Sequence, residues 1–237
     1  MPNPYFSFKQ FTVYHDRCAM KVGIDGVLLG VWAPVGTATH VLDIGTGTGL
    51  IALMIAQRSQ AVIDAIDIEP QAVLQAIVNV NHSPWSDRVQ VMEISLQEFA
   101  ETTDRRYDLI VSNPPYFINS TKAPSDNRTT ARHADSLTHE ELIHHAMLLL
   151  KPSGRLCVIL PVNEGLQCVD TALRNGLYCS RQVSIFPKPG ADAKRLLLEF
   201  SLNPCEKLIS GLTIETEQRH HYSEDFTRLA KDFYLKL

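Results

Sequence analysis

The stretch Val41–Leu50, which reads VLDIGTGTGL, joins an apolar run to a turn in which every second residue is glycine. The run from His40 to Ile44 has the length and apolar content of a buried strand, and Leu50 to Gln57 has those of a helix. Glycines between a strand and a helix permit a tight turn and let a ligand approach the backbone closely. The stretch therefore predicts the first strand–turn–helix unit of an α/β fold.

The same alternation continues along the chain. We expect further strands at about 61–66, 89–93, 107–112 and 156–160, helices at about 70–81, 139–150 and 163–175, and a last pair of strands at 179–186 and 196–202. Strands that alternate with helices form a mostly parallel sheet covered on both faces. We predict a doubly wound, Rossmann-like α/β fold with seven strands, of which the last two are antiparallel.

Composition limits the class of protein. The chain has 237 residues, of which 45% are hydrophobic, and no Gly/Ser-rich linker, as is typical of one globular domain. Its five cysteines include no CxxC pair, and the first residues lack a secretory signal pattern. We therefore expect reduced thiols, no metal and a cytoplasmic monomer that does not enter a membrane. The net charge of −4 means that any basic surface for nucleic acid must be local.

Two acidic residues flank the predicted ligand site. Asp43 precedes the glycine turn, where it disfavours a pyrophosphate but suits a ligand that carries ammonium and sulfonium charges. Asp67 ends the second predicted strand, about twenty residues further on, where an acidic side chain can accept both ribose hydroxyls. Glu69 competes for that role, and either residue could instead cap the helix that begins at Pro70.

The tetrapeptide NPPY (113–116) follows the apolar run Leu109–Val111 after one serine. Methylation of a planar exocyclic amine calls for two fixed hydrogen-bond acceptors, and the Asn113 side chain and the Pro114 carbonyl supply them. Tyr116 can stack on an extruded base. These three are the predicted catalytic residues. The alternative is a strand that ends in a structural proline turn.

The glycine turn, Asp67 and NPPY together resemble the class I S-adenosylmethionine-dependent methyltransferases that act on amino groups. Other segments are similar to one family, the tRNA1(Val) (adenine(37)-N6)-methyltransferases: residues 8–11, 15–32 (HDRCAMKVGIDGVLLGVW), 81–85 and 232–235. The likeness spans essentially the whole chain. It implies one methyltransferase domain over residues 1–237, with 1–33 as an N-terminal extension that covers the cofactor site and 34–237 as the catalytic core.

The resemblance also implies roles for individual residues. Lys21 to Asp25 would cover the methionine end of the cofactor, and Ser95 would lie near its adenine. Ile24 stands where threonine is expected, and Ser95 where aspartate is common. The predicted cofactor-binding residues are Lys21, Val22, Asp25, Asp43, Gly45, Gly47, Gly49, Asp67, Ile68, Ser95, Leu96 and Asn113.

The segment from Phe117 to Ser136, behind NPPY, is long and polar, and loops of that length are usually functional or disordered. It carries Lys122, Arg128 and Arg132, and it is therefore the predicted RNA-binding element. A solvated loop without a partner is the alternative. Lys194 and Arg195 are interpreted as flanking residues of the last strand. The predicted RNA-binding residues are Tyr116, Phe117, Lys122, Arg128, Arg132 and Lys188.

Other activities are compatible with part of this pattern. A protein-glutamine N5-methyltransferase, or a DNA or rRNA amino-methyltransferase, would use the same tetrapeptide. A nucleotide-dependent oxidoreductase would use a similar sheet, but NPPY has no evident role in hydride transfer. His139 and His144 are five residues apart and do not share a helical face, so a zinc protease helix is not expected.

Overall fold

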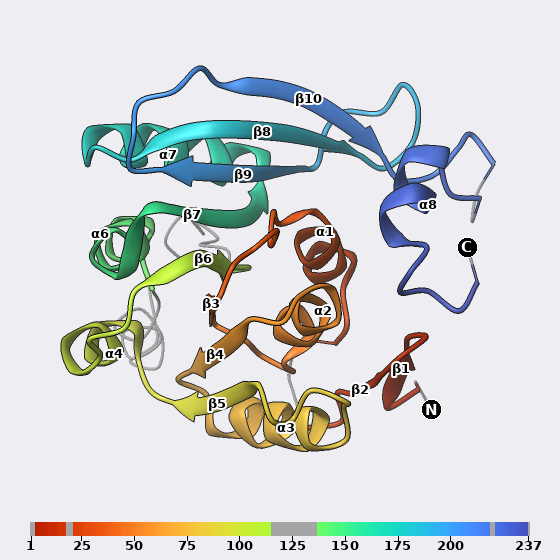
Figure 1. Ribbon diagram of the computed structural model, residues 1–237. Helices are drawn as coiled ribbons and strands as arrows, with labels where there is room; N and C mark the ends of the chain where they lie inside the picture. Colours follow the sequence, from red (N-terminus) through yellow and green to blue (C-terminus); the bar gives the residue numbers. More distant parts are fainter. Residues whose placement is uncertain (1–2, 18–20, 115–136, 219–220, 237) are drawn as a thin grey trace, which may run out of the picture.

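The computed structural model describes residues 3–17, 21–114, 137–218 and 221–236. Within these ranges, eight strands form one twisted sheet in the order β10-β8-β9-β7-β6-β3-β4-β5 (Figure 1). Seven of them run parallel, and β9 is antiparallel to both of its neighbours. The strands are β3 (His40–Ile44), β4 (Val62–Asp67), β5 (Val89–Glu93), β6 (Tyr107–Ser112), β7 (Leu150–Pro161), β8 (Tyr178–Phe186), β9 (Arg195–Ser201) and β10 (Leu208–Thr213).

The predicted doubly wound α/β fold and the antiparallel β8–β9 pair are confirmed. The predicted number of strands is wrong, because β10 adds an eighth at the edge of the sheet. Leu208 to Gly211 are exposed, so the strand carries no apolar pattern that marks burial. β7 also begins earlier than expected, at Leu150, and its register with β6 shifts between Tyr107 and Leu109.

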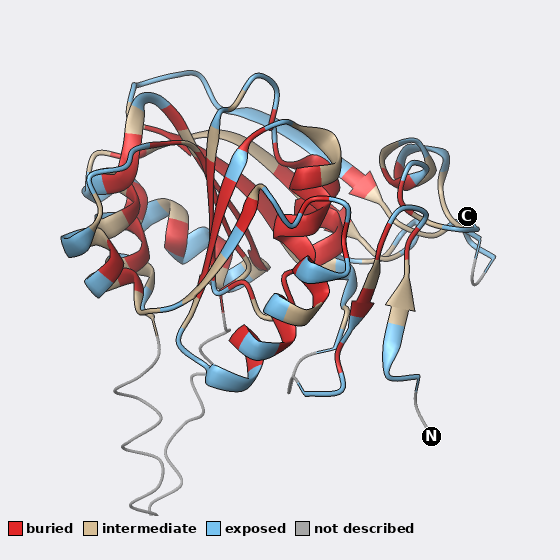
Figure 2. Cartoon of the chain, turned by 60° about the horizontal axis from the view of Figure 1, so that its bottom comes forward, coloured by how far each residue is buried: buried red, intermediate tan, exposed pale blue. Residues whose placement is uncertain are grey.

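Helices cover both faces of the sheet (Figure 1). On one face lie α1 (Ile24–Trp32), α2 (Leu50–Arg58) and α3 (Pro70–Asn81), and on the other lie α4 (Leu96–Thr102), α6 (His139–Leu149) and α7 (Val162–Arg174). Neighbouring residues of a strand point to opposite faces. Val41 accordingly packs in the core under α1 and α2, and Leu42 packs in the core under α4 and α6. The central strands and the inner sides of the helices are buried, and the outer sides of the helices are exposed (Figure 2).

Both ends of the chain pack together at one side of this sandwich. An N-terminal hairpin of β1 (Tyr5–Ser7) and β2 (Thr12–Tyr14) carries Phe8 and Phe11, whose rings stack 4.7 Å apart. Phe11 contacts Trp85 edge-on at 5.6 Å, and Phe8 contacts Tyr234 beyond the C-terminal helix α8 (Glu224–Ala230). This aromatic cluster fixes the hairpin against the core, and the hairpin leads into the residues before α1.

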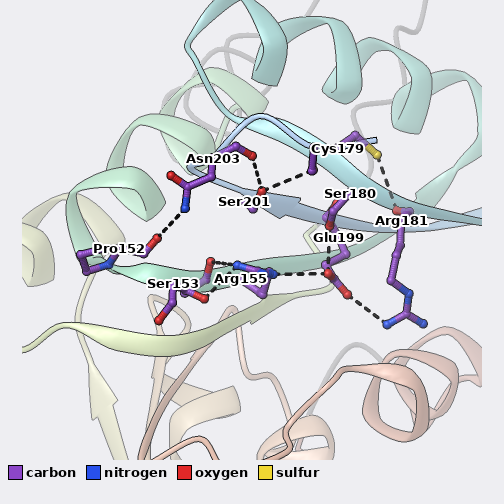
Figure 3. Close-up of polar contacts among 11 residues, drawn as sticks. Pro152, Ser153, Arg155, Cys179, Ser180, Arg181, Glu199, Ser201 and Asn203 are labelled. Carbon is purple, nitrogen blue, oxygen red and sulfur yellow. Dashed lines mark hydrogen bonds and ion pairs between the residues drawn. The ribbon is translucent and has the colours of Figure 1, made fainter. Parts of the chain in front are cut away.

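A buried carboxylate ties the antiparallel strands together (Figure 3). Glu199 on β9 is 5% exposed and accepts hydrogen bonds from Ser180 at 2.8 Å and Arg181 at 3.0 Å, both on β8. Arg155 on β7 approaches it from the other side, at 3.5 Å. The Arg181 guanidinium also lies 4.6 Å from the centre of the Trp32 ring, at the end of α1. These contacts fix β9, which begins at the functional cavity described next.

Candidate functional site

A cavity of about 1060 Å³ lies at the carboxyl ends of β3, β4, β5 and β6. Doubly wound sheets bind ligands in the crevice where the strand order switches direction. Here the switch lies at β3, because the next strand of the chain, β4, pairs with one side of β3 and the later strand β6 pairs with the other side. Its walls come from seven segments of the chain. They are residues 21–26, 44–48 with 50–51, 66–69 with 72, 94–97, 112–114, the pair Leu137 and Glu141, and Arg195.

The glycine turn forms the floor of the cavity. Gly45 and Gly47 have φ angles of 69° and 57°, and a Cβ atom added at either would meet no atom within 4 Å. The space above them is therefore open to a ligand. Gly49 faces away, because a Cβ atom there would lie 3.5 Å from Ala76 on α3. Gly49, with a φ of 79°, is the N-cap residue of α2 and does not line the cavity.

Asp67 lies at the end of β4 with its carboxylate against the turn. Its two oxygens accept hydrogen bonds from the backbone N–H of Gly47 at 2.8 Å and of Glu69 at 3.0 Å. Glu69 also lines the cavity, but its side chain caps α3 by accepting from the N–H of Gln71. Both carboxylates thus bond to backbone N–H groups, and Asp67 is the one that bonds to the glycine turn. Ile68, next to it, is exposed at the cavity.

Asp43 is close to the turn but does not line the cavity. Its carboxyl group is fully buried, and Oδ2 accepts hydrogen bonds from the Thr46 hydroxyl at 2.6 Å and from the N–H of Ala52 at 3.2 Å. Oδ1 has no hydrogen-bond partner among the described residues. Burial raises the pKa of this carboxyl to about 7. Asp43 therefore connects the glycine turn to α2 from behind.

Two residues of the tetrapeptide lie at the opposite wall. Asn113 and Pro114 follow β6 and line the cavity, with Asn113 half-buried and Pro114 buried. The Ser112 hydroxyl donates to the carbonyl of Ile44 at 2.9 Å, which holds the end of β6 against the end of β3. Both residues thus share one cavity with the glycine turn and Asp67. The other predicted residues of this segment, Tyr116, Phe117, Lys122, Arg128 and Arg132, lie outside the described residues.

The third wall comes from the N-terminal part of the chain. Lys21, Val22 and Asp25 line the cavity, and so does Ile24, the residue that departs from the family pattern. Asp25 Oδ2 accepts a hydrogen bond from Nε of Arg195 at 2.7 Å. The interpretation of Arg195 as a mere flanking residue of β9 is incomplete, because it also lines the cavity. The sequence carries no local signal for this pair.

Of the remaining predicted residues, Ser95 and Leu96 line the cavity and Lys188 does not. Ser95 and Leu96 line it at the start of α4, where the Ser95 hydroxyl accepts from the N–H of Glu98 at 3.1 Å. Glu141, which is not among the predicted site residues, also lines it and accepts a hydrogen bond from Gln97. Lys188 is exposed in the loop between β8 and β9 and does not line the cavity.

Comparison with known proteins decides the family. A model of the methyltransferase small domain matches residues 27–176. The chain belongs to this family. Curated relatives from Parabacteroides distasonis and Trichodesmium erythraeum, both named tRNA1(Val) (adenine(37)-N6)-methyltransferase, are similar over their whole length. The first is 52% identical over 100% of both chains, and the second is 48% identical over 98% of both.

Solved methyltransferase structures share the fold at low identity. A predicted O-methyltransferase from Agrobacterium tumefaciens superimposes with a TM-score of 0.68 at 18% identity, covering 88% of this chain and 96% of that one. A methyltransferase from Pyrococcus furiosus gives a TM-score of 0.58 at 18% identity, covering 81% and 88%. Family and fold together confirm the predicted family, the methyltransferase activity and the S-adenosylmethionine cofactor.

The cavity fits that cofactor. Open space above Gly45 and Gly47 lies beside the Asp67 carboxylate, so a ribose and its substituents could rest on the turn within reach of an acceptor. Within the described ranges, no group of three or more His, Cys, Asp or Glu side chains is arranged to hold a metal ion, and no helix is both long and apolar enough to cross a membrane.

Proposed function

We propose that this methyltransferase transfers a methyl group from S-adenosylmethionine to N6 of adenine 37 in tRNA1(Val). The observation that carries the proposal is that Asn113 and Pro114 line the same cavity as the glycine turn and Asp67. The substrate follows from full-length relatives of 46–52% identity, all of which are named for this reaction.

The floor and two walls of the cavity would hold the cofactor. When bound, S-adenosylmethionine supplies a methyl group that its sulfonium charge activates. Asp67 would accept hydrogen bonds from the ribose hydroxyls, and Gly45 and Gly47 would allow close approach of the methionine end. Lys21, Val22 and Asp25 would cover that end, and Ile68, Ser95 and Leu96 would surround the adenine. Gly49 and Asp43 would act from behind, by shaping the turn.

Asn113 and Pro114 would prepare the target amine. The nitrogen of an amino group on an aromatic ring is a poor nucleophile, because its lone pair is delocalised into the ring. Oxygen acceptors from the Asn113 side chain and the Pro114 carbonyl would bind the two N–H bonds and direct the lone pair toward the methyl group. The proton can leave after the nitrogen becomes positively charged, so no strong base is required. Tyr116 would stack on the base.

Further features belong to the same proposal. We infer that residues 1–237 form one methyltransferase domain, with 1–33 as an extension over the cofactor site, and that it acts as a cytoplasmic monomer. Phosphate contacts from Lys122, Arg128, Arg132 and Lys188, with a stacking contact from Phe117, would hold the RNA. The alternative of protein-glutamine N5-methylation is not favoured, since the full-length relatives are named for tRNA.

Mapping of the methylated nucleotide tests the proposal. Unmodified tRNA1(Val), the same tRNA with guanine at position 37, a DNA duplex and a release-factor peptide are each incubated with cofactor labelled in its methyl group. The label should appear only in the first RNA, as N6-methyladenine at position 37 after nuclease digestion. Label in the peptide, or equal label in both RNAs, would contradict it.

A further inference from the structure

Two buried amide side chains attach the N-terminal segment to helix α3. Gln75 and Asn79 are one turn apart on this helix and are 1% and 0% exposed. A buried amide is unfavourable unless its polar atoms find partners. The partners of both residues therefore show what the two amides hold in place.

Asn79 bonds to two separate segments at once. Its Oδ1 accepts from the N–H of Tyr14 at 2.9 Å, and its Nδ2 donates to the carbonyls of Tyr14 at 2.9 Å and of Thr48 at 2.8 Å. Both hydrogens of the amide are used, together with its oxygen. Tyr14 is the last residue of β2, and Thr48 belongs to the glycine turn. One side chain thus joins the hairpin to the cavity floor.

Gln75 continues this attachment one helical turn earlier. Its Oε1 accepts from the N–H of Arg17 at 3.1 Å. Asn79 and Gln75 hold the chain at Tyr14 and Arg17, and residues 21–26, a few positions further on, form the N-terminal wall of the cavity. The two amides therefore fix the part of the chain that leads directly to the N-terminal wall.

We propose that Asn79, assisted by Gln75, is a positioning residue that sets the spacing between the N-terminal wall and the glycine turn of the cofactor cavity. The inference rests on the proposed function, since it takes this cavity to be the cofactor site. Neither amide lines the cavity, so both act through Tyr14, Arg17 and Thr48. The aromatic contacts of Phe8 and Phe11 hold the hairpin independently, so loss of Asn79 should leave the chain folded.

The test compares Asn79→Ala and Gln75→Ala with Ser83→Ala. Ser83 is a matched control, because it is 9% exposed and its hydroxyl donates to Val80 and accepts from the N–H of Trp85. It follows the same helix, and both of these hydrogen bonds stay within residues 80–85. Binding of S-adenosylhomocysteine is measured by calorimetry. Amide hydrogen exchange in residues 21–26 is measured with and without that ligand, and thermal melting reports stability.

Asn79→Ala should weaken S-adenosylhomocysteine binding by about tenfold or more, since its two hydrogen bonds to Tyr14 and its one to Thr48 are lost. It should also speed exchange in residues 21–26 of the ligand-free protein. Gln75→Ala should have the same effects to a smaller degree, because it keeps the hydrogen bond from Asn79 to the carbonyl of Thr48. Ser83→Ala should lower the melting temperature but leave binding within about twofold, with exchange in 21–26 unchanged.

Equal effects of Asn79→Ala and Ser83→Ala on binding and on exchange would overturn the inference and leave only a structural role. So would unchanged binding and exchange in Asn79→Ala. The proposed function fails separately, if the unaltered protein binds S-adenosylhomocysteine but methylates no tRNA. The exchange comparison on ligand-free protein tests the positioning role in either case.

Discussion

At the scale of single residues, Asp43 is a buried carboxyl group directly before the glycine turn. Its pKa of about 7 means that the folded protein keeps this proton over a range in which the unfolded chain has lost it. A carboxyl group whose pKa is raised on folding lowers stability as pH rises from its unfolded to its folded pKa. The free energy of unfolding should therefore carry a decrease from Asp43 between about pH 4 and pH 7.

Asp43→Asn should remove that decrease. The amide oxygen can accept from Thr46 and Ala52 as Oδ2 does now, and no charge appears at high pH. We expect the stability of the variant relative to the unaltered protein to rise by a few kcal/mol from pH 4 to pH 7, since one pKa unit corresponds to about 1.4 kcal/mol. Urea denaturation of the ligand-free proteins at pH 5 and pH 8 measures this. If the stability difference between Asp43→Asn and the unaltered protein is the same at pH 5 and pH 8, the prediction is wrong.

The sequence predicted site residues well where chemistry and local spacing coincide. Gly45, Gly47 and Asp67 lie on one strand–turn–helix unit and the next strand, and they meet at the cavity as expected. The Asp25–Arg195 ion pair was not predictable, because its partners are 170 residues apart and each is an ordinary charged residue in its own segment. Asn79 was missed for the same reason, since its partners come from two other segments.

At the scale of elements, the close crossing of α1 and α2 holds the wall of the cavity in place. A Cβ atom at Gly30 would lie 2.6 Å from Met54 Sδ and 2.9 Å from Met54 Cβ. Gly30→Ala should destabilise the fold by about 1–3 kcal/mol, because the two helices must move apart. Thermal or urea denaturation measures the loss.

Gly26→Ala is the matched control on the same helix. There the nearest atom is Leu50 Cδ2, at 3.0 Å, the end of a flexible side chain, and the next two lie at the ordinary contact distances of 3.8 and 3.9 Å. Alanine also favours a helix over glycine by up to about 1 kcal/mol. We therefore expect Gly26→Ala to be neutral or slightly stabilising, and equal losses for the two variants would show that the crossing is not tightly packed.

The strands that the sequence failed to predict are short or exposed. β1 and β2 have three residues each, and β10 exposes its first four, so none of them shows the two-residue alternation that marks a half-buried strand. The strands buried on both faces, such as β3 and β6, were predicted to within a residue because they form continuous apolar runs.

At the scale of the whole molecule, a net charge of −4 has to be reconciled with an RNA partner. Lys188 is exposed just beyond the carboxyl end of β8, on the same side of the sheet's strand ends as the cavity. We expect tRNA affinity to fall by about tenfold or more between 50 and 200 mM salt, as a few phosphate contacts require. Filter binding over a series of salt concentrations measures the slope.

Lys188→Ala should reduce that slope by about one. Lys207→Ala is the control, because Lys207 is exposed just before β10, at the amino ends of the parallel strands and so away from the cavity. Its loss should leave the slope unchanged. A salt response that is flat for the unaltered protein would remove the RNA assignment. The alternation of strands and helices predicted the overall topology, but charge totals could not show where such a footprint lies.

In the proposed site Asn113 fixes the target amine while most contacts to the cofactor come from other residues, and Asn113→Ala separates these two roles. Turnover on unmodified tRNA1(Val) and the dissociation constant of S-adenosylhomocysteine are measured on the same preparation. Loss of one fixed acceptor should lower turnover by about a hundredfold or more, with cofactor affinity within a few-fold. A variant that keeps its turnover, or that loses turnover and cofactor affinity in equal measure, would contradict the account.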